Sequence, residues 1–423
     1  CWVGCFAAIR RALYVSGRSV ASAIEGKREE DTVDRLKVGI LGLRRGRMHL
    51  KNFLSLDSVE VVGAADRLER WRAPAREQLE PAGGRVVEEY EQLLDMRPDA
   101  IVVASNGRCQ VEHTRLALEA GCHVLSEVPG GMTVDELVRL RDAVEQSDRT
   151  YMFGENCCWW DFFRYWRKWV AENRFGPISL AEGEYVHYLP ATRVTPDGER
   201  LTPSQVRQRG LTDTVPIWRA DQPPIQYLTH DLGPLLEVLD DRVVSVTCRS
   251  GPWRCPEAPL RSDGQFALFE TAKGTLIRIL VTLNTHRPGE HRFRIFGTDG
   301  GAEYFSYERF TRYFDRNCAE RDGWLKADVA QAGRGSDVSG GHGGVDIQVA
   351  RAFVDTIREG RDPPIDVYRG IEYSLPGILA NQSAEQGGQT LAVPDLRRTP
   401  FTGTRIWEQI PLPEADPEMG PYR

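Results

Sequence analysis

Short apolar runs alternate with helical patterns over the first third of the chain. The apolar runs lie at 36–43, 59–66, 99–105, 123–127 and 150–154. Apolar residues recur at helical spacing between them, at 48–56, 67–79, 110–120 and 133–146. Uninterrupted apolar runs of this length are typical of strands buried in a parallel sheet, and their alternation with helices indicates βαβ units. We therefore expect a Rossmann-type α/β domain over residues 36–158.

The pattern changes after a helix expected at 161–173. The strands become longer and alternate polar with apolar residues, at 179–187, 243–249, 265–270, 275–283 and 291–297. Helical spacing returns at 345–360 and 369–386. This pattern predicts a second α/β domain, residues 159–423, built on a large, mostly antiparallel sheet. We expect the Pro-rich stretch 190–224 to be a long loop near the site, and 333–344 to be a second, glycine-rich loop.

The composition of the chain limits which kinds of partner it can bind and in which cellular compartment it is expected. The net charge of −7 argues against a nucleic-acid-binding protein, and no apolar run reaches the length of a membrane span. The nine cysteines are odd in number and form no Cys-x-x-Cys pair, which favours free thiols in a reducing, cytoplasmic setting. In residues 1–35 the basic residues follow the apolar start, the reverse of a signal peptide, so we expect a disordered leader.

A glycine motif follows the first expected strand. Gly42 and Gly46 bracket Arg44 and Arg45, and His49 follows them. Glycines between a strand and a helix let backbone N–H groups approach a pyrophosphate. The motif is one residue shorter than Gly-x-Gly-x-x-Gly, and Arg44 stands where the middle glycine is expected. We expect these five residues to contact a dinucleotide.

The ends of the next strands supply further cofactor candidates. Asp66 ends the second strand, where an acidic side chain receives the ribose hydroxyls of NAD. Its alternative role is a helix N-cap. Arg67 could hold the extra phosphate of NADP, but Asp66 favours NAD. Later strand ends and their flanks line the same crevice; these candidates are Ser105, Asn106, His113, Glu127, Val128 and Pro129.

Four blocks in this order resemble the Gfo/Idh/MocA family of sugar oxidoreductases. They are the glycine motif with His49, the segment 99–133, Trp218-Arg219 followed by Thr229-His230-Asp231-Leu232-Gly233-Pro234, and the C-terminal segment 366–374. The resemblance implies a Rossmann domain, an α/β domain with a large sheet, bound NAD and a sugar substrate. In this family the sheet often forms the oligomer interface, which implies a homo-oligomer.

The chain departs from the family at two catalytic positions. Val128 stands where most members carry the lysine that assists proton transfer at the substrate hydroxyl, and Gln226 replaces the usual aspartate. Glu-Val-Pro, as in 127–129, occurs in a branch of NAD-dependent glycosidases such as the α-N-acetylgalactosaminidases. Segments 155–158, 183–187, 227–234, 341–346 and 366–368 also resemble that branch. Ile225 and Tyr188 depart from it, each replacing an aspartate.

The branch implies a reaction that does not consume NAD. A sugar hydroxyl is oxidised to a ketone, which acidifies the neighbouring C–H bond; a base removes that proton and the anomeric group leaves. Water then adds, and the hydride returns. The resemblance assigns proton transfer to His230, Tyr185 and His342, cofactor contacts to Asn156, Trp218 and Arg219, and substrate contacts to His187, Tyr227 and Thr229.

Each of these residues also has a structural alternative. His230 could be a cap or core histidine, Tyr185 a core residue, and His342 part of a turn. The eight histidines show no metal-binding spacing such as His-x-x-x-His, so we expect no metal. The expected function is NAD-dependent hydride chemistry on a carbohydrate or glycoside, by a net dehydrogenase or a redox-neutral glycosidase. A non-catalytic NAD-bound sensor is the remaining alternative.

Overall fold

The computed structural model describes most of the chain after residue 34. The described residues are 35–257, 262–308, 310–316, 318, 324–327, 344–398, 406 and 419–421. The expected leader, apart from Arg35, and His342 lie outside them. No helix in the described part is long and apolar enough to cross a membrane.

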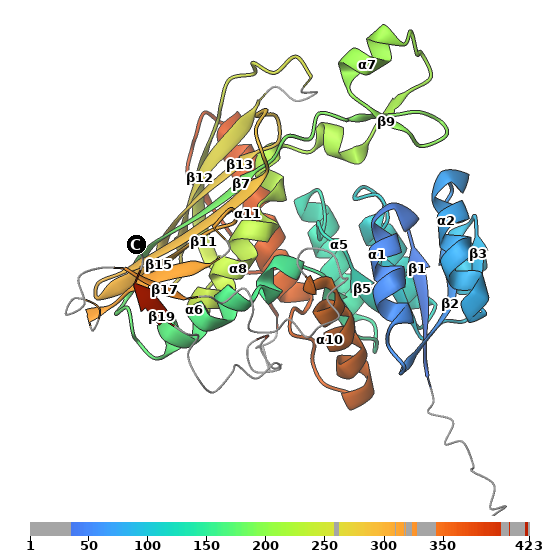
Figure 1. Ribbon diagram of the computed structural model, residues 1–423, viewed down its shortest axis with the longest axis horizontal. Helices are drawn as coiled ribbons and strands as arrows, with labels where there is room; N and C mark the ends of the chain where they lie inside the picture. The colour runs from blue at the N-terminus through green and yellow to red at the C-terminus, as the bar shows by residue number, and fades with distance from the viewer. Residues whose placement is uncertain are drawn as a thin grey trace, which may run out of the picture. The chain divides into compact units, whose positions relative to one another are not determined.

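The first sheet is the parallel sheet that the apolar runs predict (Figure 1). Its described strands follow the order β3-β2-β1-β4-β5-β6, and every neighbouring pair is parallel. The strands are β1 Leu36–Leu41, β2 Val59–Ala65, β3 Arg85–Val87, β4 Ala100–Val103, β5 His123–Ser126 and β6 Tyr151–Phe153. The pattern did not predict β3, because a three-residue strand is too short to show a periodicity. This order places the ends of β1 and β4, where the strand order reverses, at the expected cofactor crevice.

The helices of this domain follow the predicted pattern, except that one start is shifted and the five-residue helix at Tyr90–Leu94 was not predicted. They are α1 Leu43–Leu54, α2 Glu69–Leu79, α3 Tyr90–Leu94, α4 Gln110–Glu119 and α5 Val134–Glu145. We expected the first helix to begin at Met48, and this was wrong. Gly42, at φ 87°, turns the chain within one residue, so the helix begins directly after it.

The second sheet is mostly antiparallel, as predicted. Its described strands follow the order β18-β11-β12-β13-β7-β14-β15-β16-β17-β19, and only the pair β13–β7 is parallel among them. The strands are β7 Ile178–Val186, β11 Val243–Ser250, β12 Gly264–Thr271, β13 Leu276–Thr282, β14 Glu290–Gly297, β15 Gly300–Phe305, β16 Thr311–Phe314, β17 Leu325–Ala327, β18 Leu391–Ala392 and β19 Met419–Pro421. Residues alternate between buried and exposed along β12, so one face packs on helices and the other meets solvent.

Four described helices lie between this sheet and the first, packed either on the second sheet or on the first domain. They are α6 Asp161–Ala171, α8 Thr229–Leu239, α10 Asp346–Glu359 and α11 Val367–Glu385. α8 packs on β7, α11 packs on β11, and α10 packs on α1. At Gly183 of β7 a Cβ atom would lie 2.9 Å from the Cβ of Asp231, so the missing side chain lets α8 approach the strand.

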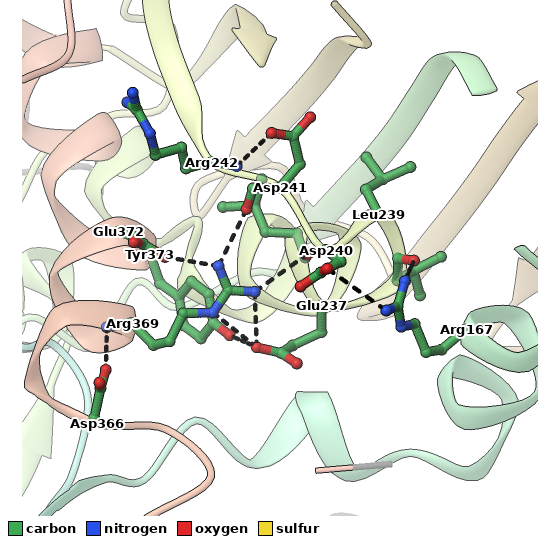
Figure 2. Close-up of polar contacts among 12 residues, drawn as sticks. Arg167, Glu237, Leu239, Asp240, Asp241, Arg242, Asp366, Arg369, Glu372 and Tyr373 are labelled. Atoms are coloured by element: carbon green, nitrogen blue, oxygen red, sulfur yellow. Dashed lines mark hydrogen bonds and ion pairs between the residues drawn. The ribbon is translucent and has the colours of Figure 1, made fainter. Parts of the chain in front are cut away.

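A buried ion-pair network joins α8 to α11. Figure 2 shows the Arg369 guanidinium between the carboxylates of Glu237 and Glu372, with hydrogen bonds of 3.0 and 2.6 Å. Arg369 also donates to the Asp241 carbonyl at 3.1 Å, and the Tyr373 hydroxyl donates to Glu237. Arg369 is 2 % exposed. The C-terminal block of the family resemblance therefore fixes the packing of two helices, because a buried charge requires partners on every side.

The stretch 190–224 is a folded lobe, so the prediction of a long loop was wrong. It contains a three-stranded sheet of order β10-β8-β9 and the helix α7 Pro203–Gln208. Its strands are β8 Arg193–Val194, β9 Arg200–Leu201 and β10 Val215–Pro216, each of two residues. Strands of that length leave no periodicity to read. Gly198 of the lobe packs against Leu68 at the start of α2, so the lobe lies against the cofactor domain.

Candidate functional site

A cavity of about 490 Å³ lies at the carboxyl ends of the parallel strands, and residues of the lobe form one of its walls. Its lining consists of strand ends, the first turn of α1, lobe residues and the start of α8. The lining residues are Gly42, Arg44, Arg45, Asp66, Leu68, Trp71, Ala104, Ser105, Asn106, Glu127, Val128, Asn156, Val194, Gly198, Arg200, Val215, Pro216, Ile217, Trp218, Arg219, Tyr227 and His230. A cavity of this size suits a small ligand or a large part of a dinucleotide.

Gly42 and Asp66 form one end of this cavity. A Cβ atom on Gly42 would lie 2.5 Å from the carbonyl oxygen of Ala104, so only glycine fits there. The Asp66 carboxylate accepts hydrogen bonds from the Leu43 and Leu68 N–H groups, at 2.8 and 2.9 Å. Asp66 therefore organises the starts of α1 and α2 while it lines the cavity. A glycine turn, a helix N-terminus and this acid fit the diphosphate and ribose of NAD.

Three arginines from separate elements line the cavity. Arg44 comes from the first turn of α1, Arg200 from β9 of the lobe, and Arg219 from the segment before α8. Burial lowers the pKa of Arg200 to about 9, and repulsion from Arg44 and Arg219 adds to the effect. Burial and Arg219 also lower the pKa of Arg44. Three guanidinium groups that repel one another favour an anionic ligand, and the diphosphate of NAD fits this requirement.

A charged network lies beside this cavity, at the end of β5. Glu127 accepts from Arg45 Nε at 2.7 Å and contacts His49 Nε2 at 2.6 Å. Arg45 also forms a bidentate pair with Asp346, at 2.9 and 3.2 Å, and Asn156 donates to Asp346 at 2.8 Å. Burial alone would raise the pKa of Glu127, but Arg45 and His49 outweigh it and hold the pKa at about 2. The network fixes α1, the end of β5 and the start of α10 in place.

His230 stands at the other end of the cavity, at the start of α8. Its Nδ1 lies 2.7 Å from Glu155 Oε1 and 3.6 Å from the Cys157 sulfur. The Glu155 side chain is fully buried, whereas that of His230 is 13 % exposed. A carboxylate on Nδ1 orients the imidazole and leaves Nε2 for a ligand. The pair therefore has the geometry of an oriented acid–base group.

Aromatic rings surround His230. Tyr185 stacks on His187 with ring centroids 4.0 Å apart, and on His230 at 5.6 Å. Arg219 donates to the Tyr227 hydroxyl at 3.1 Å. Burial, followed by Tyr227, raises the pKa of Tyr185 well above its ordinary value, although Arg219 opposes this. The sequence analysis offered Tyr185 as a base or a hydrogen-bond donor, and the raised pKa favours the neutral phenol and thus the second of these two roles.

The structure brings most of the predicted site residues to one cavity. Of the candidates, those that line it are Gly42, Arg44, Arg45, Asp66, Ser105, Asn106, Glu127, Val128, Asn156, Trp218, Arg219, Tyr227 and His230. The described candidates outside the lining are Gly46, His49, Arg67, His113, Pro129, Tyr185, His187 and Thr229. His342 lies outside the described residues.

Several candidates outside the lining are engaged with other residues. The His49 side chain is buried and contacts Glu127, and His113 Nδ1 lies 2.8 Å from the Ser105 hydroxyl. Gly46 of α1 packs against β1, where a Cβ atom on Gly46 would lie 2.8 Å from the Ile40 side chain. Arg67 is exposed and lies 3.7 Å from Glu89. His49, His113 and Gly46 thus lie behind the residues that line the cavity, whereas Arg67 lies on the surface.

The sequence analysis assigned no individual role to three residues of the site, Glu155, Arg200 and Asp346. Glu155 directly follows β6, so its place at a strand end was a usable signal. Arg200 lies in the lobe, and Asp346 meets Arg45 across 301 positions of sequence. No local pattern identifies such a partner.

Two family models match the chain. Residues 36–155 match the oxidoreductase family with an NAD-binding Rossmann fold. Residues 261–403 match the C-terminal domain of glycosyl hydrolase 109. The first match covers the parallel sheet with Gly42, Asp66 and Glu127, and the second covers β12 to β17 together with α10 and α11.

Related proteins agree with both matches. A glycosyl hydrolase family 109 protein of Saccharopolyspora erythraea is 27% identical, covering 87% of this chain and 85% of that protein. An α-N-acetylgalactosaminidase of Shewanella oneidensis is 25% identical, covering 90% and 88%. An inositol dehydrogenase homolog of Azotobacter vinelandii, complexed with NADH and myo-inositol, has the same fold, with a TM-score of 0.65 at 18% identity over 85% of this chain and 98% of that one. The chain therefore combines an NAD-binding Rossmann domain of the Gfo/Idh/MocA oxidoreductase type with a C-terminal domain of the glycosyl hydrolase 109 type, and it is an NAD-binding enzyme.

Proposed function

We propose that the protein is an NAD-dependent glycoside hydrolase that oxidises and re-reduces its sugar within one turnover. One observation carries this proposal. The cavity presents Val128 where dehydrogenases of the family carry a lysine, and it presents the oriented His230–Glu155 pair instead. The glycosyl hydrolase 109 domain and the α-N-acetylgalactosaminidase relative support the same reaction class. NAD, when bound, supplies a reversible hydride acceptor.

The residues of the chain divide the remaining work. Glu155 holds Nδ1 of His230, so Nε2 is available to exchange a proton with a sugar hydroxyl. Arg219 donates a hydrogen bond to the Tyr227 hydroxyl at the same end of the cavity. This orients the hydroxyl, which can then donate its own proton in a hydrogen bond to the sugar. Tyr185 stacks on the His230 ring and keeps it in one orientation. The lobe contributes one wall of the cavity, with Arg200, Ile217 and Trp218 among its lining residues.

A glycoside panel separates the three candidate functions. The wild-type protein and His230→Ala are incubated with nitrophenyl glycosides, with and without NAD, while nitrophenol absorbance and NADH fluorescence are followed. We expect nitrophenol release without accumulation of NADH. Accumulating NADH indicates a net dehydrogenase, and bound NAD with neither signal indicates a sensor; either result refutes the proposal. His230→Ala should abolish turnover and keep its NAD affinity, whereas the exposed control His286→Ala should keep both.

We further propose that copies of the chain associate through the outer face of the second sheet. Leu180, Phe266, Leu268 and Leu276, on β7, β12 and β13, are 47%, 50%, 45% and 40% exposed. Leu180 and Leu276 are direct neighbours across the β7–β13 pair. Apolar side chains grouped on one sheet face support an interface. Leu268→Lys should lower the mass found by sedimentation equilibrium, whereas the exposed control Glu77→Lys should not; a monomeric wild type would refute the proposal.

We also propose a separate role for each of the two domains and a cellular compartment for the protein. Residues 36–158 hold the cofactor, and residues 159–423 bind the substrate and carry the oligomer interface. The free thiols of the described cysteines, five of them buried, support a reducing, cytoplasmic compartment. Partial proteolysis with and without NAD tests the first point, because NAD should protect 36–158 more strongly than the rest.

A further inference from the structure

Three potential metal ligands converge beside the cavity, and the proposed reaction uses only two of them. Glu155, Cys157 and His230 each offer one ligand atom, and these atoms lie within 4.8 Å of one another. Glu155 and Cys157 are buried and follow β6, whereas His230 lines the cavity from α8. We propose that these three residues form a binding site for a divalent cation of the zinc class, and that its occupancy inhibits the enzyme.

The spacing of the ligand atoms suits a tetrahedral ion. Zinc binds sulfur at about 2.3 Å and imidazole nitrogen at about 2.0–2.1 Å, so the two ligand atoms lie about 3.5 Å apart at a tetrahedral angle. The Cys157 sulfur lies 3.6 Å from His230 Nδ1. The separation of the sulfur and the nitrogen therefore matches that of two ligands on one zinc ion.

The carboxylate has room to complete the set. Glu155 Oε1 lies 2.7 Å from His230 Nδ1, which is a hydrogen-bond distance and shorter than the roughly 3.4 Å between zinc-bound oxygen and nitrogen. Glu155 Oε2 is buried and has no hydrogen-bond partner among the described residues. A carboxylate with one unsatisfied buried oxygen can rotate toward a cation with a gain in free energy. The unpartnered oxygen is thus a second indication of a missing ligand.

Charge selects the class of ion. A carboxylate and a thiolate carry two negative charges, and these cancel a divalent cation, so the occupied site has no net charge to bury. The sulfur and nitrogen ligands favour zinc over Mg²⁺ or Ca²⁺, which prefer oxygen. Burial, followed by Glu155 and Asp231, raises the pKa of Cys157 well above its ordinary value, so the free site holds a thiol. When the Zn–S bond forms, the S–H bond breaks and its proton passes to water.

Metal binding without substrate tests the site directly. The purified chain, treated with EDTA and dialysed, is titrated with Zn²⁺ against a chromophoric chelator and with Co²⁺ by visible absorption. We expect one zinc per chain and the absorption of a thiolate-bound, tetrahedral Co²⁺ ion. Cys157→Ser and His230→Ala should each weaken zinc binding by at least about 100-fold. Thermal unfolding of both variants verifies that they are folded.

The adjacent cysteine is the matched control. Cys158 is equally buried and also interacts electrostatically with Glu155, but its sulfur is not among the three converging ligand atoms, so Cys158→Ser should bind zinc as the wild type does. No stoichiometric zinc, or equal weakening by both serine variants, would overturn the proposal. Inhibition rests on the proposed function of His230: glycoside hydrolysis by the wild type and by Cys158→Ser should fall with zinc and return with EDTA. Hydrolysis by Cys157→Ser should change much less, each protein being compared with its own zinc-free rate. Binding without any hydrolytic activity would uphold the metal site and refute the proposed function.

Discussion

Replacement of Arg45 by methionine should destabilise the protein strongly at neutral pH. Methionine keeps the length of the side chain and its helix propensity but removes the cation. Arg45 pairs with Glu127 and with Asp346, whose side chains are 9% and 0% exposed. The variant therefore leaves two buried carboxylates near one another without their common partner.

Two arguments give a similar magnitude. Removal of one member of a buried ion pair costs about 3–5 kcal/mol, because the remaining charge stays buried. Independently, the pKa of Glu127 lies at about 2 instead of 4.5, which corresponds to about 3 kcal/mol of stabilisation of its ionised form. His49 supplies part of that stabilisation, and the loss of the Asp346 contact adds to the cost. We expect a loss of about 3–5 kcal/mol in the free energy of unfolding.

The pH dependence has a definite sign. A carboxyl group whose pKa is lowered by folding contributes stability above its ordinary pKa, and this stability is lost as the pH falls through the folded pKa. Without Arg45, buried Glu127 protonates at a higher pH, which removes the cost of its charge. The difference between wild type and variant should therefore be largest near neutral pH and should narrow in acid.

Urea unfolding followed by tryptophan fluorescence measures this difference. The wild type, Arg45→Met and the control Arg47→Met, which is exposed on the same helix, are compared at pH 7 and pH 4.5. If Arg45→Met and Arg47→Met agree within about 1 kcal/mol at pH 7, the buried network does not stabilise the fold as argued.

Three other substitutions test separate parts of the structure. Asp66→Ala should lower NAD affinity about 10- to 100-fold in a calorimetric titration, and unchanged affinity would exclude a ribose contact. Gly42→Ala places a Cβ atom 2.5 Å from the Ala104 carbonyl at φ 87°, so we expect a loss of at least about 2 kcal/mol of stability; a wild-type melting temperature would contradict this. Arg369→Met leaves Glu237 buried without its cation and should cost about 3–5 kcal/mol, part of which Glu237→Gln in the same chain should restore.

The elements that the sequence predicted well are those with a local signal. β1, β2, β4 and β5 are apolar runs of four to seven residues, and each lies where its run was found. A strand buried on both faces is apolar along most of its length, so its sequence alone identifies it. The start of α1 was missed because a turn at a single glycine leaves no periodic pattern. The lobe was missed because strands of two residues are too short to show one.

The sequence likewise determined which residue types stand at the strand ends, including Asp66, Glu127 and the valine at position 128. It did not determine their partners. Glu127 accepts from Arg45, 82 positions away, and Arg45 reaches Asp346 across 301 positions, while Glu155 meets His230 across 75. Periodicity reports which face of an element is buried, whereas the partner of a buried charge depends on how distant elements pack. For this reason the tertiary structure alone decided that His49 contacts Glu127 behind the cavity wall, that the lobe adds Arg200 to the cavity, and that a carboxylate orients His230.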